Sequence, residues 1–335
     1  MTSPLATSKY LYYHSFMIRI EAQSDTTLSI PMHELRSNFL FASSQIVVGK
    51  KTFRDVLGPI PLPISHPLYG ELKEGFPASF IFFALPSQQE PRLIRSNCLE
   101  CKKKSIITIN LIIIGDRVKF FTEFVESIKL MISRGFGHPV VSFVIVDIFE
   151  NHPFKTVPIM KKDGIILSQP SMPIRYLDFE HNQFSRQQII FKFDSPTLLY
   201  KSEDNNLKKE MPGVYAQNNG LFSFYHIVRS VTERSIKLSV LYCGAKVDDY
   251  ETDKDRLIIY LQQATKLKLA ACNLINIQLP DLKQKGRSDS VQLGGLIGTM
   301  AFIGHFNCYI PLLFFFQDLC VGKNIAYGLG KYSIS

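Results

Sequence analysis

The sequence predicts an α+β protein made of two domains that share one order of secondary-structure elements. Its 335 residues, with 46% hydrophobic and 20% charged side chains, are enough for two cores of ordinary size. Each half shows the pattern strand, helix, strand, strand, helix, strand, with glycines between the last helix and the last strand. This is the order of the ferredoxin-like (RRM-like) fold. We therefore expect tandem ferredoxin-like domains at residues 1–150 and 189–335, a connecting segment at 151–188 and a C-terminal glycine-rich loop.

The first half opens with an apolar and aromatic run, followed by a polar, turn-prone stretch. Its clearest helix has apolar residues at helical spacing on one side and ends at Gly135. The run Ser105–Ile114 is too apolar to have a solvent-exposed face, which is typical of a central strand. The expected elements are strands at Tyr10–Ile20, Ala78–Leu85, Ser105–Ile114 and Val140–Phe149, and helices at Gly49–Gly58 and Lys119–Arg134.

The second half repeats this order with one addition, an acidic surface segment at Asp248–Asp255 that precedes a short helix. Between the halves, Ile159–Ile166 has hairpin character. The other expected elements are strands at Ile189–Phe193 (running into Thr197), Leu267–Leu279, Leu293–Phe302 and Lys331–Ser335, and helices at Leu221–Leu241 and Tyr309–Phe316.

The net charge of +9 favours an anionic partner such as a nucleic acid or an acidic membrane surface. No apolar run approaches the roughly 20 residues of a spanning helix, and Met1–Lys9 lacks the apolar core of a signal peptide. Six irregularly placed cysteines suit reduced thiols, so we expect a cytoplasmic protein without a membrane partner. Cys98 and Cys101 have metal-ligand spacing but no second pair, and no nucleotide-binding fingerprint occurs, so neither a metal nor a cofactor is expected.

The most informative segment is the glycine-rich loop, Gly322–Gly330. Glycines let the backbone approach a phosphate closely, Lys323 supplies positive charge, and Tyr327 offers a ring on which a base can stack. The alternative is an ordinary turn before a strand. The loop differs from a P-loop because it leads into a strand and lacks the Gly-Lys-Ser/Thr ending.

Several segments, taken in order, resemble a known family. Gly294–Gly298, Val321–Lys323 and Gly328–Tyr332 look like the C-terminal signature of the CRISPR-associated repeat-processing endoribonucleases of the RAMP superfamily. Phe193–Leu199 is similar to the first strand of that family's second domain, and Leu111–Gly137 is similar to the end of its first domain. The individual motifs are loose, and their order and spacing carry the resemblance.

The resemblance implies two ferredoxin-like domains facing each other across a basic cleft, in a prokaryotic protein that cuts the repeats of a CRISPR transcript (pre-crRNA) into mature crRNA. The family's cleavage needs no metal, because the 2′-hydroxyl of the RNA attacks the adjacent phosphate with the help of a general base and a general acid. It also implies CRISPR repeat RNA as the partner, with other Cas proteins of an effector complex as further candidates.

Histidine is the usual acid or base in such chemistry because its pKa lies near neutral pH. Three histidines are alternative catalytic candidates: His66 in the proline-rich loop, His33 in the polar stretch, and His305 before the last helix. For each of them an ordinary loop histidine is the competing interpretation. His138, before Pro139 in the first glycine turn, is a weaker candidate than these three. We interpret His14, His152, His181 and His226 as structural or surface residues.

Basic residues and glycines near the turns are the candidates for RNA contacts. They are Lys50, Lys51, Arg54, Arg287, Gly322, Lys323, Gly328, Gly330 and Lys331. The sequence departs from the family pattern at Cys320, where relatives often carry a histidine just before Val-Gly-Lys. Two alternatives to the enzyme therefore stay open: a catalytically inactive repeat-RNA-binding subunit of an effector complex, and an unrelated two-domain RNA-binding protein.

Overall fold

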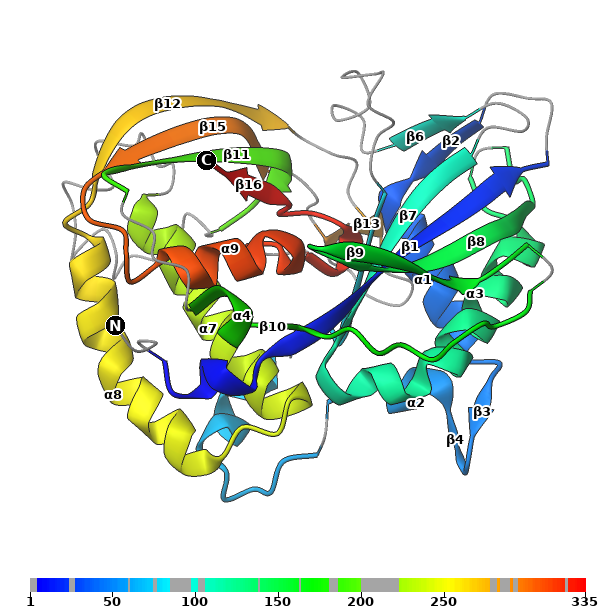
Figure 1. Cartoon of the computed structure of the whole chain (residues 1–335), viewed down its shortest axis with the longest axis horizontal. Coiled ribbons are helices and arrows are strands. Elements are labelled where there is room, and N and C mark those ends of the chain that lie inside the picture. Colours follow the sequence, from blue (N-terminus) through cyan, green and yellow to red (C-terminus); the bar gives the residue numbers. More distant parts are fainter. Residues whose placement is uncertain are drawn as a thin grey trace.

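The computed structural model describes residues 5–23, 28–59, 61–74, 77–84, 98–101, 106–137, 139–162, 164–180, 186–199, 223–277, 282–283, 290–291, 295–322 and 325–335. Two antiparallel sheets dominate it, one in each half of the chain (Figure 1). Helices α7, α8 and α9 lie on one side of the second sheet, and the chain crosses from the first sheet to the second once.

The first sheet has the strand order of a ferredoxin-like domain. The strand β1 (Tyr12–Ala22) lies between β7 (Ile106–Ile114) and β8 (Phe143–His152), and β5 (Phe80–Ala84) pairs with the outer edge of β7. The helices α1 (Met32–Ser43) and α3 (Phe121–Arg134) make the two crossovers. The short elements of this half are η1 (Thr7–Tyr10), β2 (Leu28–Pro31), β3 (Val47–Val48), β4 (Lys51–Thr52), α2 (Phe53–Val56), η2 (Pro67–Glu74), β6 (Cys98–Cys101) and η4 (Gly115–Phe120).

The second sheet repeats that order. The strand β11 (Gln188–Thr197) lies between β15 (Gly295–Ile303) and β16 (Tyr332–Ile334), and β12 (Lys268–Ile277) pairs with the outer edge of β15. The crossover helices are α7 (Phe224–Tyr242) and α9 (Ile310–Leu319), with α8 (Val247–Ala264) as an addition; β13 (Leu282–Lys283) and β14 (Ser290–Val291) form a separate pair. The predicted α+β fold of tandem ferredoxin-like domains is confirmed.

The strand predicted to be central, Ser105–Ile114, corresponds to β7. Its apolar composition is explained by two hydrophobic cores that meet at this strand. Ile109, Leu111 and Ile113 pack with α1 and α3, whereas Ile112 and Ile114 face a second core formed with α7 and α9. Because successive side chains of a strand point to opposite faces, both faces of β7 are buried. The two domains therefore share a continuous apolar interface instead of being joined only by the connecting segment.

A close backbone approach also joins the domains. Gly115, after β7, has φ +58°, and a Cβ there would lie 2.1 Å from the carbonyl oxygen of Tyr242 at the end of α7. The Tyr242 hydroxyl donates a hydrogen bond to the carbonyl of Pro77, with an oxygen–oxygen distance of 2.7 Å. Only glycine fits at position 115 without moving the end of α7 away from the first sheet.

The first crossover helix is not where the sequence predicted it. The segment Gly49–Gly58 forms the turn and second strand of the β3–β4 hairpin and the single turn α2, which Thr52 and Asp55 cap reciprocally. The helix of the domain is α1, in the stretch interpreted as turn-prone. Leu35, Phe39 and Ala42 are buried at spacings of four and three, and this apolar stripe is hidden among serine and asparagine in the sequence.

The helix α8 differs from its prediction as well. It includes the acidic segment that was expected to lie on the surface before a short helix. Asp253 is fully buried, and its carboxylate accepts hydrogen bonds from the backbone amides of Ala6 and Thr7 and from the Thr7 hydroxyl. The acidic residue thus ties the N-terminal segment to the second domain, although burial raises the pKa of Asp253.

Part of the expected connecting segment lies in the first sheet. The strand β8 runs to His152, β9 (Lys155–Met160) pairs with it, and β10 (Ile174–Arg175) pairs with β1; α4 (Leu177–Glu180) follows. The expected hairpin character is present as a bridge between Met160 and Ile166. The domain boundaries at residues 150 and 189 remain a prediction.

A buried carboxylate holds this region in place. Glu150, on β8, is fully buried and accepts hydrogen bonds from His14 Nδ1 at 2.6 Å and from the backbone amides of Ser171 and Met172 at 2.9 and 3.0 Å. Burial alone would raise the pKa of Glu150, but these donors outweigh burial and lower it.

No helix within the described ranges is long and apolar enough to cross a membrane.

Candidate functional site

The glycine-rich loop closes on its own backbone. The amide of Val321 donates to the carbonyl of Gly330 at 2.9 Å, and the amide of Gly330 donates to the carbonyl of Pro196 at 3.1 Å. Gly330 has φ +81°, and a Cβ there would lie 1.9 Å from the Val321 oxygen; a Cβ on Gly322 would lie 2.7 Å from the Leu198 oxygen. These two glycines are therefore required by the packing of the loop on the second domain.

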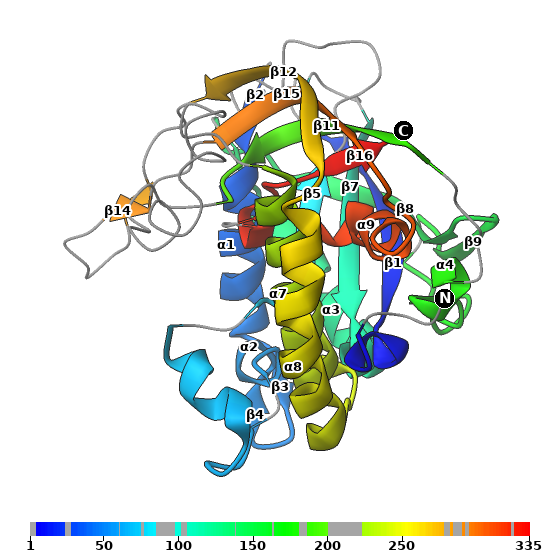
Figure 2. The ribbon, with the colours of Figure 1, turned by 90° about the vertical axis from the view of Figure 1, so that its left-hand side faces the viewer.

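The same loop reaches the first domain. Its η5 turn (Ile325–Tyr327) packs against α1 and β5, and Ile325 is buried there. Figure 2 shows this C-terminal segment beside α1. His33 is the second residue of α1, so the structure brings the helix of one predicted catalytic histidine to the predicted RNA-binding loop. The side chain of His33 lies outside the described part, as do Lys323, Asn324 and the side chain of Tyr327.

Lys331, at the end of the loop, belongs to a network between the domains. Its ammonium group donates to Asp318 Oδ1 at 2.7 Å and lies 4.8 Å from the ring centroid of Phe83 on β5. The Tyr13 hydroxyl on β1 donates to Asp318 Oδ2 at 2.9 Å. Asp318 on α9 is thus held by one donor from each domain, and we call Tyr13, Asp318 and Lys331 the junction network.

A buried positive charge lies on α7 behind the loop. The Nε and Nη2 atoms of Arg234 are buried and have no hydrogen-bond acceptor among the described residues, and burial lowers the pKa of Arg234 to about 10. The guanidinium therefore stays charged at neutral pH, near Cys320 and Tyr242. One turn earlier on α7, the Ser230 hydroxyl accepts a hydrogen bond from the Gly322 amide at 3.0 Å.

Cys320 occupies an unusual backbone position immediately before the loop. It is fully buried and has φ +63°, the one non-glycine residue with positive φ in the described ranges. Burial raises the pKa of the Cys320 thiol to about 11, so at neutral pH the thiol is protonated. Cys320 therefore cannot do the work of an imidazole that titrates near pH 7.

His66 and His305 lie at other places in the fold. His66 is buried just before η2; its Nδ1 accepts from the Leu68 amide at 3.1 Å, and its ring lies 5.7 Å from that of Tyr250 on α8. Burial lowers the pKa of His66. His305 is exposed before the N-terminus of α9, whereas the glycine-rich loop follows its C-terminus, about 15 Å away for a helix of 10 residues.

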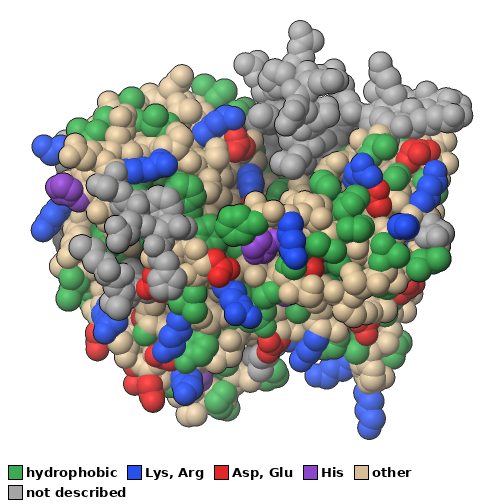
Figure 3. Space-filling view, viewed as in Figure 1, with side chains coloured by type: hydrophobic (Ala, Val, Ile, Leu, Met, Phe, Trp, Pro, Cys, Tyr) green, Lys and Arg blue, Asp and Glu red, His purple; other side chains and the backbone are tan. Residues whose placement is uncertain are grey.

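The predicted basic contacts fall into separate groups. Lys50, Lys51 and Arg54 are exposed on the β3–β4 hairpin and α2, away from the junction network, and Arg287 lies outside the described residues. On the face drawn in Figure 3, lysines and arginines are spread over both domains among acidic side chains. The described side chains on this face therefore form no single basic patch.

Several residues of the junction were missed from sequence. Tyr13, Asp318 and Arg234 are far apart in the chain, and no local pattern distinguishes them from ordinary strand or helix residues. A local signal does exist at His152-Pro153-Phe154-Lys155, where an exposed aromatic stands between two basic residues in a tight turn.

Among the described residues, no group of three or more His, Cys, Asp or Glu side chains is placed to hold a metal ion.

The class defined by this architecture is the tandem ferredoxin-like α+β protein whose glycine-rich loop meets the first domain. No protein-family model matches the sequence, and no curated protein matches it. Solved structures do match. A Cas6 protein of Thermus thermophilus in a product complex is 12% identical, with 97% of this chain and 99% of that chain covered and a TM-score of 0.53.

A second similar structure is a chain of a partial Cas6-RT-Cas1–Cas2 complex. It is 10% identical and has a TM-score of 0.55, and the alignment covers 99% of this chain and 47% of that chain. At such identities the likeness concerns the fold. The chain described here has the Cas6 fold over nearly its whole length.

Proposed function

We propose that the protein binds CRISPR repeat RNA and cleaves it without a metal ion to give mature crRNA. The observation that carries the proposal is the contact of the glycine-rich loop with α1, which joins a candidate RNA-binding segment to the helix of His33. The likeness to a Cas6 product complex over 97% of the chain supports the same class of activity. The working environment is the prokaryotic cytoplasm.

Such a cleavage depends on positioned acid–base groups and positive charge. The 2′-hydroxyl of the RNA loses its proton to a general base and attacks the adjacent phosphorus, and the leaving 5′-oxygen takes a proton from a general acid. His33 is our choice for one of these roles, with His66 and His305 as alternatives. The first-turn amides of α1 carry partial positive charge, which favours an approaching phosphate.

The glycine-rich loop and nearby cations supply the binding energy in this proposal. Lys323 contacts the RNA backbone from the loop that Gly322, Gly328 and Gly330 shape, and Lys331 and Arg287 add positive charge. Lys50, Lys51 and Arg54 contact phosphates further along the strand. Other Cas proteins are candidate partners, since a Cas6 fold occurs in a chain of a Cas6-RT-Cas1–Cas2 complex.

A second function is favoured by one observation, the nature of Cys320. A buried thiol with a pKa of about 11 stands where the resembling family often has a histidine. If that histidine is essential to cutting, the protein binds repeat RNA within an effector complex without cleaving it. This alternative shares the RNA site with the enzyme and differs from it only in the chemical step.

RNA binding tests what the two functions share. We expect labelled repeat RNA to bind with an affinity that falls steeply with salt, because lysines and arginines displace counterions from phosphates. Replacing Lys50, Lys51 and Arg54 together by alanine should make binding less dependent on salt. The negative slope of log affinity against log salt should become about two units shallower, as the loss of three single-strand phosphate contacts predicts. Fluorescence anisotropy at several salt concentrations measures this slope.

The control for this experiment is a pair of exposed lysines in the connecting segment, Lys161→Ala with Lys162→Ala. It removes charge of the same sign at residues to which we assign no RNA contact, so its slope should stay close to that of the unchanged protein. Equal slopes for the triple variant and the unchanged protein would remove Lys50, Lys51 and Arg54 from the site.

A further inference from the structure

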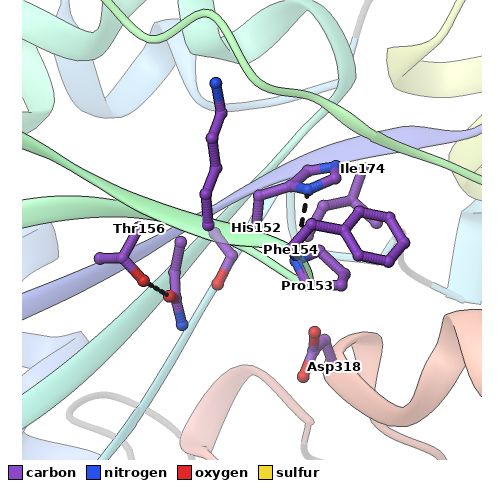
Figure 4. Close-up of a pocket in the computed structure, with 9 residues that line it drawn as sticks. His152, Pro153, Phe154, Thr156, Ile174 and Asp318 are labelled. Atoms are coloured by element: carbon purple, nitrogen blue, oxygen red, sulfur yellow. Dashed lines mark hydrogen bonds between the residues drawn. The ribbon is translucent and has the colours of Figure 1, made fainter.

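A pocket of about 480 Å³ lies between the β8–β9 turn and the C-terminal end of α9 (Figure 4). Its walls include Ser15 on β1, His152 at the end of β8, Phe154 in the turn, Lys155 at the start of β9, and Asp318 on α9. Figure 4 shows the rings of His152 and Phe154 side by side, with Asp318 across the pocket from them. The pocket thus combines an aromatic ring, an imidazole, an ammonium group and a carboxylate from both domains.

Phe154 presents an exposed aromatic ring at the pocket. Its side chain is 88% exposed, the highest value among the large apolar side chains that are described as exposed. The ring lies against the imidazole of His152, with centroids 5.4 Å apart and an angle of 47° between the planes. An exposed aromatic ring beside cationic groups is the common platform on which unpaired bases stack.

Hydrogen-bond donors lie on one side of the Phe154 ring. Lys155 is exposed on the rim, next to His152, whose Nδ1 faces the Phe154 amide at 3.5 Å. That arrangement leaves Nε2 of the neutral imidazole as an N–H donor. Lys155 and His152 therefore present donors to a phosphate or a ribose hydroxyl at the mouth of the pocket.

Asp318 gives the opposite wall a fixed acceptor. Its Oδ1 already accepts from Lys331 and its Oδ2 from Tyr13, which holds the carboxylate in one orientation while each oxygen keeps a further lone pair. A carboxylate repels a phosphate but accepts hydrogen bonds from base N–H groups. Guanine presents two neighbouring donors, N1–H and the N2 amine, that match the two carboxylate oxygens.

From this arrangement we propose that the pocket binds one unpaired guanine nucleotide of an RNA strand. Phe154 stacks on the base, Asp318 accepts from its N–H groups, and Lys155 with His152 holds the adjoining phosphate. The inference rests on the proposed RNA-binding function and adds a nucleotide subsite, on the face of the first domain next to α9, to the glycine-rich loop. The preference for guanine would thus arise at this pocket, which takes no part in the proposed cleavage step.

The test compares hexauridylate carrying one internal guanosine with the same RNA carrying adenosine or inosine there. We expect the guanosine RNA to bind about tenfold more tightly than either, because inosine lacks the N2 amine and adenosine lacks both donors. Phe154→Ala should weaken binding of the guanosine RNA about 5- to 100-fold, and Lys155→Ala should weaken all three RNAs alike. Free guanosine monophosphate, which lacks the strand, should bind more weakly than the RNA.

The matched controls are Ile64→Ala, an exposed apolar residue in the proline-rich loop, and Lys268→Ala, an exposed lysine on β12. Both should bind the guanosine RNA within twofold of the unchanged protein. Since Phe154 is exposed in a turn, Phe154→Ala should also unfold at an unchanged temperature, and Phe154→Tyr should restore affinity.

Three outcomes separate the ideas. Equal binding by Phe154→Ala and the unchanged protein overturns the pocket and leaves the proposed function standing. Equal affinity for the three RNAs overturns the role of Asp318 and the preference for guanine. If the unchanged protein binds neither these short RNAs nor labelled repeat RNA, the proposed function is overturned, and the subsite with it.

Discussion

Alanine in place of His33 is expected to slow cleavage of repeat RNA by roughly 10²–10⁴-fold while RNA affinity stays within about threefold. The expected loss is large because a positioned general acid or base acts on the proton only as the phosphate is attacked, so its removal costs transition-state stabilisation and leaves binding intact. Single-turnover rates with saturating protein measure the chemical step directly.

The matched variants are His66→Ala and His305→Ala, which should cleave within a few-fold of the unchanged protein. Because His66 is buried against Tyr250, its variant needs a measured unfolding temperature before its rate is interpreted. A loss of 10² or more confined to His66→Ala or His305→Ala would move the catalytic group to that position. Unchanged cleavage in all three variants would exclude each of them as the essential acid or base.

Alanine in place of Gly330 is expected to lower the free energy of unfolding by about 2–5 kcal/mol. Two costs combine: a side chain at φ +81° is strained, and the new Cβ would lie 1.9 Å from the Val321 oxygen, so the closing segment of the loop must move. Denaturant unfolding measures the change, and RNA binding should weaken as a consequence of the displaced loop.

The control for Gly330 is Gly49→Ala. Gly49 also has positive φ, +62°, but a Cβ there would meet nothing within 4 Å, so the variant pays only the backbone cost of about 1 kcal/mol. If Gly330→Ala is as stable as the unchanged protein, the packing explanation is wrong. Weak RNA binding with unchanged stability would instead indicate that the glycine serves the RNA directly.

The strands were predictable because burial is written into local composition. The run Ile106–Ile114 has no polar face, and the structure buries one face in each of two cores. The helix α1 was missed because only Leu35, Phe39 and Ala42 carry its stripe, among residues that also favour turns. In α8 the buried Asp253 looked like surface charge, since its partners Ala6 and Thr7 are almost 250 residues away.

The candidate site was predictable only where it is local. The glycine-rich loop stood out from sequence, and the close approaches of Gly322 and Gly330 explain two of its glycines. The junction network joins β1, α9 and the loop, and such a grouping depends on the tertiary fold. The role of Phe154 likewise depends on α9 lying opposite the β8–β9 turn, and the sequence does not show that this ring is exposed.

Cleavage of end-labelled repeat RNA in the presence of EDTA tests the central claim most directly. We expect one discrete cut within the repeat at an unchanged rate, leaving a 2′,3′-cyclic phosphate on one product and a free 5′-hydroxyl on the other. A cut that appears only when a divalent metal is restored contradicts the proposed mechanism. Tight binding without cutting under either condition contradicts the enzyme and supports the inactive repeat-RNA-binding subunit.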